Sequence, residues 1–389
     1  MFLAGVAQLP RQFPKLVGLG RRAVLWPVVF VVLFLIWLCI SAAWSPADTA
    51  LITGSIREGN FSVDAPQIRF GLTVLAAGSF LWAALQWEPG VRTKLPAIML
   101  VSTLLLLAGL LAISPFRQTI IEAQGAGLWP SAQSAGRAVN LLALCLPLAV
   151  GLIMARFEPT PAIVTSALII ALLVMIAVRM GGAAVVIALL AAPMVFCVLN
   201  ASRDLGWKWL FYLLGAAVLT APLFAHFGTS ALSDMGQSLP VSAHQRLLIW
   251  QETVARIAEK PLFGHGADAA TSWHGTFSQR PDWLSLMPDN FALVRIIPGH
   301  PHNMALQIWA ETGLVGACLI AGGFASLGRS LPPPASLRIE VRLAAAGVFS
   351  VAATLFFVSY SAWDESYWAA LAIIASSLIV IHKFCMRST

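Results

Sequence analysis

The chain has 389 residues, of which 59% are hydrophobic and only 11% charged, and its mean hydropathy is +0.82. Soluble proteins carry roughly a quarter charged residues, so this composition excludes a soluble, a disordered and a fibrous protein. The formal net charge of +7 does not by itself indicate nucleic-acid binding, because membrane proteins concentrate Lys and Arg on their cytoplasmic side. We therefore expect an all-α polytopic membrane protein.

Ten segments are long and apolar enough to cross a bilayer, which takes about 20 residues per helix. The fifth and sixth form one apolar stretch that is too long for a single crossing, so we predict a turn at Arg179-Met180-Gly181-Gly182. Residues 45–67 and 115–136 leave room for further helices, which gives 10 to 12 in all. We expect the first span to be retained and not cleaved as a signal peptide. The ten spans cover residues 23–43, 68–87, 95–114, 138–155, 161–178, 181–199, 209–225, 304–324, 343–360 and 367–384.

The distribution of basic residues predicts that both termini are cytoplasmic. In that orientation the cytoplasmic segments hold fourteen Lys and Arg residues against four acids, and the short outer segments hold five basic residues. This bias follows the positive-inside rule and accounts for the net positive charge. We expect a bilayer as the environment and no nucleic-acid partner.

The spans divide the chain into three parts: an N-terminal transmembrane bundle over residues 1–225, an outer loop over residues 226–302, and C-terminal helices over residues 303–389. The loop is 77 residues long and contains six of the seven histidines. Loops of this length are uncommon unless they have a function or a fold of their own. Because histidine transfers protons near neutral pH, the loop is the first place to look for chemistry.

Within the loop, residues 243–260 are predicted to form an amphipathic helix. Ser242 and Gln245 form a capping box, and Pro261 ends the helix. Arg246 lies at the margin of the apolar face, where it either reaches lipid headgroups or presents a planar fork to a phosphate. The apolar residues that repeat at helical spacing are Leu247, Trp250, Val254, Ile257 and Ala258.

Two short motifs follow the helix. Gly264 and Gly266 flank a histidine in a turn, where glycine permits backbone conformations closed to other residues. The loop ends in His300-Pro301-His302-Asn303. A zinc site would need a third ligand at a readable spacing, and none is evident, so we expect no metal and no cofactor.

The next span contains Glu311. A charge in the hydrocarbon of a bilayer is costly, so a membrane-embedded acid usually has a role. We expect Glu311 to lie just below the membrane surface, hydrogen-bonded to the loop, and to organise His302 or Asn303.

Together the motifs form an ordered set: Arg246-x-x-x-Trp250, Pro261-Leu262-x-Gly264-x-Gly266, His302-Asn303-x-x-Leu306-Gln307 and Glu311-x-Gly313-x-x-Gly316. Each motif alone is weak. In this order, after a series of spans and across a long outer loop, they resemble the O-antigen ligase and Wzy polymerase superfamily of bacterial inner-membrane glycosyltransferases. The motif region covers residues 243–316, and the pattern of spans extends the likeness over most of the chain.

The resemblance implies a GT-C-like enzyme that moves a glycan from undecaprenyl pyrophosphate to an acceptor hydroxyl on the periplasmic side, without a metal. It implies that His302 and Arg246 are catalytic and that Arg246 and Arg179 bind the pyrophosphate. The family arginine usually stands in a Ser-Arg-Gly context, whereas Val178 and Met180 flank Arg179 here. Arg137, one turn before Asn140, is a third candidate for the pyrophosphate. Asn303, Glu311, Gly264 and Gly266 are expected to support these residues.

Within the superfamily, an O-antigen ligase that delivers to the lipid A core is our first choice. The alternatives are a Wzy-type polysaccharide polymerase and a protein O-oligosaccharyltransferase. A flippase for lipid-linked sugars is the non-enzyme alternative. It predicts internal repeats and charges near the midplane, whereas the sequence shows no repeat, one embedded acid, and polar residues gathered on one face. Trp273 and Trp283 in the loop either stack on sugars or anchor the protein at the membrane interface, and the second role is more common.

Overall fold

The computed structural model describes residues 21–48, 65–88, 94–116, 129–180, 182–233, 241–279 and 294–387. The described residues contain eleven α-helices, short 3₁₀ turns and a single isolated β-bridge between Thr276 and Arg295. Ten of these helices are long and apolar enough to span a membrane. The protein is therefore an all-α polytopic membrane protein, as its composition predicts.

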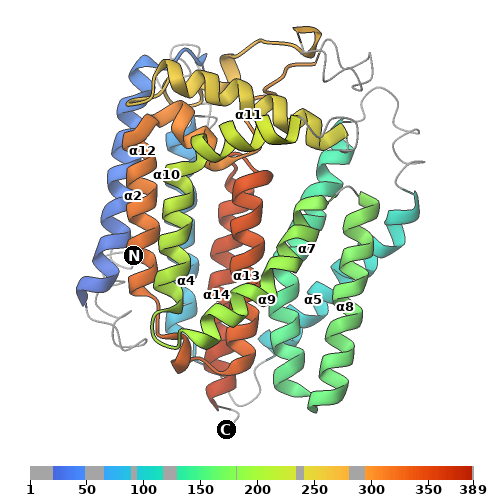
Figure 1. Cartoon of the computed structure of the whole chain (residues 1–389). Helices are drawn as coiled ribbons and strands as arrows, with labels where there is room; N and C mark the ends of the chain where they lie inside the picture. Colours follow the sequence, from blue (N-terminus) through green and yellow to red (C-terminus); the bar gives the residue numbers. More distant parts are fainter. Residues whose placement is uncertain are drawn as a thin grey trace, which may run out of the picture.

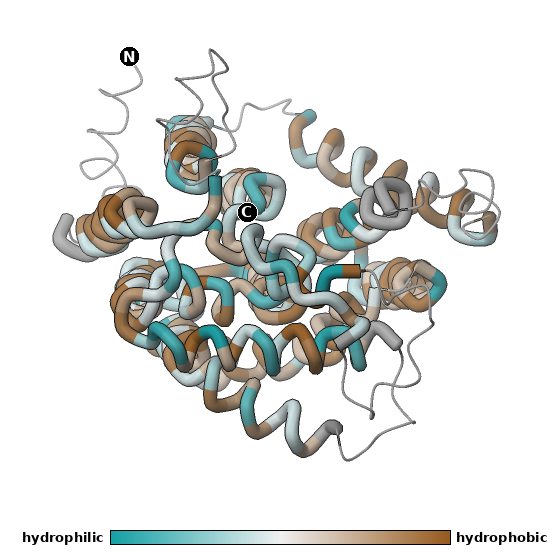
Figure 2. Tube along the Cα trace, turned by 90° about the horizontal axis from the view of Figure 1, so that it is seen from above, coloured by the Kyte–Doolittle hydropathy of each residue, from teal (hydrophilic) through white to brown (hydrophobic). Residues whose placement is uncertain are grey.

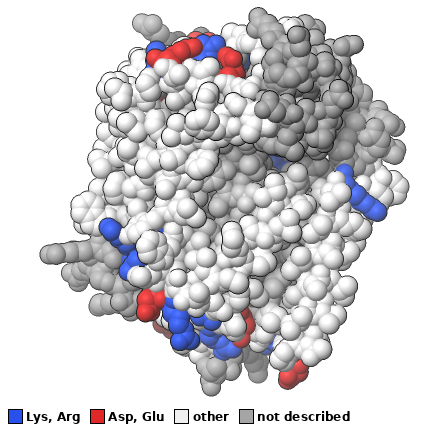
Figure 3. All heavy atoms as spheres, in the orientation of Figure 1, with Lys and Arg blue, Asp and Glu red and all other residues white. Residues whose placement is uncertain are grey.

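The ten candidate spans stand roughly side by side, and charged side chains on the face shown gather mostly at the two ends of the molecule (Figures 1 and 3). Hydrophobic residues line the helices seen end-on in Figure 2. The helices are α2 (Arg21–Ser41), α4 (Pro66–Gln86), α5 (Leu95–Ile113), α7 (Trp129–Arg156), α8 (Pro159–Met180), α9 (Ala183–Ala201), α10 (Gly206–Ser233), α12 (Met304–Ser330), α13 (Ile339–Val358) and α14 (Glu365–Arg387).

Two central helices organise the bundle. Helix α12 packs against α2 and α10, whereas α7 packs against α13, which in turn contacts α9. Among the candidate spans, α7 and α12 are the most enclosed by their neighbours. Because lipid cannot hydrogen-bond to polar groups, polar side chains that these two helices carry are directed into protein or toward the membrane surface.

The predicted spans match ten helices, but several boundaries differ. Helix α7 begins at Trp129 instead of residue 138, and α10 continues to Ser233 instead of ending at residue 225. His226, predicted to open the outer loop, therefore lies within α10. The apolar sequence around it, including Phe224 and Phe227, extends the helix further than a minimal membrane crossing requires.

The predicted turn between the fifth and sixth spans is confirmed. Helix α8 ends at Met180, Gly182 donates a backbone hydrogen bond to Ala177 at 2.6 Å, and α9 begins at Ala183. Residues 49–64 and 117–128, where further helices have room, lie outside the described residues.

The amphipathic helix predicted over residues 243–260 is α11 (Val241–Glu259), which ends just before Pro261. Figure 1 shows it lying across one end of the bundle, at a steep angle to the spans. Leu247 and Ile257 are buried, whereas Ala258, predicted to be on the apolar face, is exposed. The helix lies on the bundle because a small apolar core joins it to the rest of the loop; this core consists of Leu248, Ile249, Ala270, Phe277, Ile296 and Ile297.

Candidate active site

Helix α12 is interrupted where the outer loop meets it. Gly313 has non-helical backbone angles (φ 66°, ψ −166°) in the middle of an otherwise continuous helix. The carbonyl groups of Ala310 and Glu311, which would accept bonds from the next helical turn, accept instead from the backbone N–H groups of His265 at 2.9 Å and Gly266 at 2.8 Å. The loop thus satisfies carbonyl groups that the break would leave unpaired.

The exchange is reciprocal. Leu314 and Val315 lie beyond the break, and their N–H groups donate to the carbonyl oxygens of Pro261 at 2.9 Å and Leu262 at 3.4 Å. The segment after α11 is therefore inserted into the hydrogen-bond ladder of α12. A connection of this kind fixes the loop relative to the bundle without a strand or a disulfide.

Glycine is required at this junction. Gly264 (φ 69°) and Gly266 (φ 101°) both adopt left-handed backbone angles, as does Gly313. A Cβ atom on Gly264 would overlap the backbone of Glu311, and one on Gly266 would overlap the backbone of Ser45. The prediction that Gly264 and Gly266 adopt conformations closed to other residues is confirmed, and the close approach of the chains supplies a second reason for glycine.

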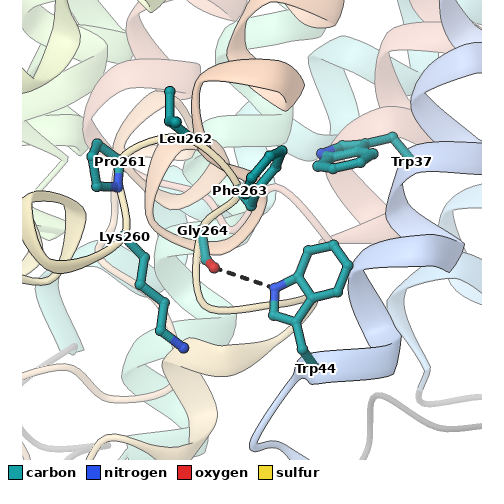
Figure 4. A pocket seen from close by; sticks show the side chains of 7 residues that line it. All are labelled: Trp37, Trp44, Lys260, Pro261, Leu262, Phe263 and Gly264. Carbon is teal, nitrogen blue, oxygen red and sulfur yellow. Dashed lines mark hydrogen bonds between the residues drawn. The ribbon is translucent and has the colours of Figure 1, made fainter.

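Helix α2 holds the junction from the other side. The Nε1 atom of Trp44 donates to the carbonyl oxygen of Gly264 at 3.2 Å (Figure 4), and Trp37 Nε1 donates to the carbonyl oxygen of Thr312 at 2.9 Å. Trp37 and Trp44, together with Phe263, also line a shallow apolar hollow beside the turn. Helix α2 and the 3₁₀ turn after it (Ala42–Trp44) therefore help to fix both chain segments of the junction, the loop turn and the break in α12.

Glu311 is fully buried and accepts three hydrogen bonds. Its Oε1 atom accepts from Gln307 Nε2 at 3.0 Å, and its Oε2 atom accepts from the backbone N–H of Asp268 at 2.7 Å and from Trp363 Nε1 at 2.6 Å. The expected hydrogen bond to the loop is thus present. None of these bonds goes to His302 or Asn303 directly.

Gln307 continues this network to the turn between α13 and α14. Its Oε1 atom accepts from the backbone N–H of Ala362 at 2.8 Å and from Ser361 Oγ at 3.1 Å. The same turn contains Ser359, whose carbonyl oxygen lies 3.2 Å from His302 Nδ1. Glu311 is therefore linked to His302 through Gln307 and this turn.

The contact with Ser359 defines the tautomer of His302. A carbonyl oxygen only accepts, so Nδ1 carries the hydrogen and Nε2 keeps its lone pair. The backbone of His302 is in the left-handed region (φ 53°), which costs a non-glycine residue about 1–3 kcal/mol and is typical of functional sites. Burial and the charge of Arg246 lower the pKa of His302, although the bond to Ser359 opposes this. The ring is therefore neutral near pH 7, with a basic nitrogen available.

His300 lies against His302, with the ring centroids 4.4 Å apart. Its Nδ1 atom accepts from the backbone N–H of His302 at 3.1 Å. Burial, His302 and Arg137 lower the pKa of His300 to about 3. The second histidine of the pair is thus neutral as well.

Arg246 and Arg137 bring positive charge to the histidine pair from two elements. Arg246 is half-buried in α11, and burial lowers its pKa. One turn later Trp250 Nε1 donates to the carbonyl oxygen of Pro301 at 3.1 Å, which fixes this face of α11 next to the histidines. Arg137 is exposed in α7 and acts electrostatically on His300.

Arg179, the third predicted pyrophosphate ligand, lies in the last turn of α8 and is exposed. Its end of α8 is next to α7, because a Cβ on Gly182 would lie 3.3 Å from Val139 Cγ1. Among the described residues, no contact joins Arg179 to the histidine pair. The structure thus brings together Arg137, Arg246 and His302, and leaves Arg179 at the same end of α7 and α8.

Asn303 has a local role. Its Oδ1 atom accepts from the backbone N–H of Leu306 at 3.1 Å, so it caps the first turn of α12. This cap fixes the start of the helix directly after His302.

Several polar groups at the site were not predicted from sequence. Asn140 Nδ2 lies 3.4 Å from both Ser359 Oγ and Tyr360 OH, which joins α7 to the turn after α13. Burial raises the pKa of Tyr360. None of them belongs to a motif. The position of Ser359 and Tyr360 on the connection after α13 is a sequence signal that could have found them, whereas Asn140 lies within α7.

Two further histidines of the loop, His244 and His265, are buried, and His265 has a structural role. His265 Nε2 lies 2.8 Å from the carbonyl oxygen of Arg256, and its ring contacts Trp273 edge-on at 5.8 Å between centroids. Arg256 also lies over the Trp273 ring at 5.9 Å. Trp283 lies outside the described residues. Within the described part of the chain, no group of three or more His, Cys, Asp or Glu residues is arranged to hold a metal ion.

Comparisons with known proteins agree with the motif region. Residues 126–321, about half of the chain, match a family model described as O-antigen ligase. One stretch is 31% identical over 110 residues to a protein from Rickettsia bellii (strain RML369-C), which covers 28% of this chain and 26% of that protein. Another is 33% identical over 88 residues to a protein from Rickettsia conorii (strain ATCC VR-613 / Malish 7), which covers 23% and 20%. Both relatives carry the name "Putative polysaccharide ligase".

The matches to these two relatives span about a quarter of their length or less. The family match is broader, because it takes in α7 with Arg137, the whole of α11 and the outer loop, and the first part of α12 with Glu311. On the strength of that match, the chain belongs to the O-antigen ligase family.

Proposed function

We propose that the protein is an O-antigen ligase that transfers a glycan from undecaprenyl pyrophosphate to a hydroxyl group of the lipid A core. The observation that carries the proposal is the hydrogen bond from His302 Nδ1 to the Ser359 carbonyl at 3.2 Å. It leaves Nε2 as a basic nitrogen beside two arginines, Arg137 and Arg246, whose charges act on the histidine pair. A base next to cations suits a reaction between a hydroxyl group and a pyrophosphate ester.

His302 is the general base of the proposed reaction. Its Nε2 atom accepts the proton of the acceptor hydroxyl as the hydroxyl oxygen forms a bond with the anomeric carbon. The bond from that carbon to the phosphate oxygen breaks at the same time, and undecaprenyl pyrophosphate leaves with the electron pair. Attack from the face opposite the leaving group inverts the anomeric centre. General-base catalysis contributes roughly a hundred- to ten-thousandfold to such a step.

Arginines provide the counter-charge for the leaving group. Arg246 and Arg137 bind pyrophosphate oxygens through their planar guanidinium groups, and Arg179 contributes from the end of α8. A pyrophosphate lipid is an activated donor, so binding and charge stabilisation are the main tasks that remain for the protein. For this reason we propose that transfer is independent of a metal.

We further propose that the site faces the periplasm of a bacterial inner membrane and that both termini are cytoplasmic. The positive-inside bias supports this orientation. At the end of the bundle that we propose to be cytoplasmic lie Arg156, Arg338 and Lys383. There the Arg338 guanidinium donates to the Cys385 carbonyl oxygen at 3.0 Å. The histidine pair lies at the start of α12, and Arg329 lies in its last turn.

A transfer assay tests the proposal. The purified protein is incubated in EDTA with an undecaprenyl-pyrophosphate oligosaccharide and, in separate reactions, a lipid A core acceptor, a Ser/Thr peptide or no acceptor. We expect a glycosylated lipid A core with the wild type and none with His302→Ala. Lengthening of the lipid-linked donor would reassign the protein as a polymerase, and a glycosylated peptide as a protein O-oligosaccharyltransferase. Transport of the lipid-linked sugar with no covalent product would indicate a flippase.

A further inference from the structure

We propose that His300 is a second binding residue of the site and that its Nε2–H group donates a hydrogen bond to a pyrophosphate oxygen of the lipid-linked donor. This inference rests on the proposed function, because it names a ligand for the donor of that reaction. It differs from the role of His302, which receives a proton, whereas His300 keeps its proton throughout.

The tautomer of His300 follows from its backbone contact. The N–H group of His302 points at His300 Nδ1 over 3.1 Å. An N–H group only donates, so Nδ1 must be the acceptor and cannot carry hydrogen. In a neutral imidazole the single hydrogen then sits on Nε2. The two neighbouring rings are therefore in opposite tautomers: His302 has a free lone pair at Nε2, and His300 has a donor there.

The protonation state is fixed by the surroundings. Burial, His302 and Arg137 all disfavour a charged His300, and they lower its pKa to about 3. Protonation would also place a hydrogen on Nδ1 and break the bond to His302. The ring is thus a neutral donor near neutral pH, and it does not compete with His302 for the acceptor proton.

The charges around the ring favour an anion. Arg137 acts on His300 and Arg246 acts on His302, so positive charge reaches the pair from two elements. This field attracts a pyrophosphate to the histidine pair.

The Nε2–H group of His300 makes no hydrogen bond with the described part of the chain, and the residue is half-buried. Arginines bind phosphate through charge, whereas a fixed neutral N–H group adds direction without adding charge. We therefore assign His300 to orientation of the pyrophosphate next to Arg137.

The test distinguishes the backbone contact of His300 Nδ1 from ligand binding by its Nε2–H group. In His300→Asn, the Asn side-chain oxygen accepts from the backbone N–H two residues later, as in an Asx turn, so the contact to residue 302 is retained. The Asn amide is too short to reproduce the Nε2–H group. In His300→Gln, the longer side chain places an N–H group near the position of His300 Nε2, but it does not form the Asx turn. His274→Asn is the matched control, since His274 is an exposed loop histidine.

Two measurements are made on purified full-length protein: binding of undecaprenyl pyrophosphate itself, and the KM of the lipid-linked donor and of the acceptor. We expect His300→Asn to weaken undecaprenyl-pyrophosphate binding and to raise the donor KM by roughly ten- to a hundredfold, the range for a hydrogen bond to a charged group. We expect the acceptor KM, the melting temperature and the His274→Asn variant to be unchanged. Partial recovery of binding in His300→Gln would support the assignment further.

The inference is overturned if His300→Asn binds undecaprenyl pyrophosphate within twofold of the wild type, or if only its acceptor KM rises. These outcomes are distinct from a failure of the proposed function. Transfer that persists in His302→Ala, or binding without any transfer by the wild type, would contradict the function but not the ligand role of His300. A wild type that does not bind undecaprenyl pyrophosphate would contradict both.

Discussion

The indole nitrogen of Trp363 lies 2.6 Å from a carboxylate oxygen of Glu311, which ties the turn before α14 to the middle of α12. Gln307 forms a second link between the same elements, because it contacts Glu311 with one end of its amide and the backbone of Ala362 with the other. The Ser359 carbonyl of this turn also accepts a hydrogen bond from His302 Nδ1, so we propose that the buried acid helps to orient this histidine through the turn.

We expect Glu311→Gln to lower kcat by about tenfold or more while the KM of the donor changes little. An amide at this position offers only one acceptor oxygen and turns N–H groups either toward Gln307 Nε2 or toward the donors of Asp268 and Trp363, so at least one buried donor loses its partner. Transfer kinetics and thermal melting of the purified variant measure the effect. Glu259→Gln is the control, because Glu259 is exposed at the end of α11. An unchanged kcat in Glu311→Gln would show that the network does not position His302.

The junction between the loop and α12 predicts a strong effect of small substitutions. Gly313→Ala places a side chain in a left-handed conformation and against the Leu262 carbonyl, so we expect a loss of at least about 2 kcal/mol in stability and little folded protein in the membrane. Gly78→Ala is the matched control, because nothing lies within 4 Å of a Cβ there. Alanine in a helix is favoured over glycine, so this control should keep or raise the melting temperature. Equal melting temperatures for the two variants would contradict the inserted junction.

The pKa of His302 predicts the acid limb of the pH profile. As the proposed general base, His302 works only when it is neutral, and burial holds the pKa of His302 below 6.5. Activity should therefore persist as the pH falls through 6.5 and decline only at lower pH. The kcat/KM of the wild type, measured from pH 4 to 8 with product detection, gives the midpoint. A midpoint above 6.5 would contradict the neutral, buried histidine.

Stability should also depend on pH through His300. Its pKa is about 3 in the folded protein and about 6.5 in the unfolded chain, so between these values the unfolded state binds more protons. The contribution of neutral His300 to the free energy of unfolding is complete above pH 6.5, and it falls by up to about 1.4 kcal/mol for each pH unit below that value. Between pH 7.5 and 4, the melting temperature of the wild type should fall more steeply than that of His300→Asn once the pH drops below about 6.5. Parallel curves would mean that His300 is not kept neutral by the fold.

Arginine geometry at the proposed pyrophosphate site predicts that lysine is a poor replacement. Arg246→Lys keeps the charge but loses the planar fork, so we expect the donor KM to rise by about tenfold. Arg256→Lys on the same helix is the control, because Arg256 pairs with Glu252 at 3.3 Å and Glu259 at 3.2 Å and lies away from the histidine pair along α11. A donor KM that is insensitive to Arg246→Lys would place the pyrophosphate elsewhere.

Sequence patterns predicted the spans well because the bilayer sets a single strong requirement, a long run of apolar residues. They also predicted the break at Arg179 and the end of α11 before Pro261, where Gly and Pro act locally, whereas α11 begins at Val241, so that Ser242 lies inside the helix and is not its N-cap. The extent of α10 was underestimated, because the apolar sequence with Phe224 and Phe227 continues the helix past the length that a membrane crossing requires.

The candidate site was predicted only in part. Motif spacing identified Arg246, His302 and Glu311 because they share a continuous stretch of chain with recognisable glycines. Ser359 and the connection through Gln307 depend on contacts between distant segments, and a single sequence does not contain that information. The tautomers of the two histidines likewise follow from backbone groups whose positions only the structure defines.

The most direct test of the account is to separate donor binding from transfer in one variant. In the presence of EDTA, His302→Ala is compared with the wild type and with His274→Ala for binding of undecaprenyl pyrophosphate and for glycan transfer to the lipid A core. We predict that His302→Ala binds undecaprenyl pyrophosphate within a few-fold of the wild type and loses transfer by roughly a hundredfold or more, as expected for a missing general base, while His274→Ala retains both. Transfer by His302→Ala at a rate close to that of the wild type would contradict the central claim.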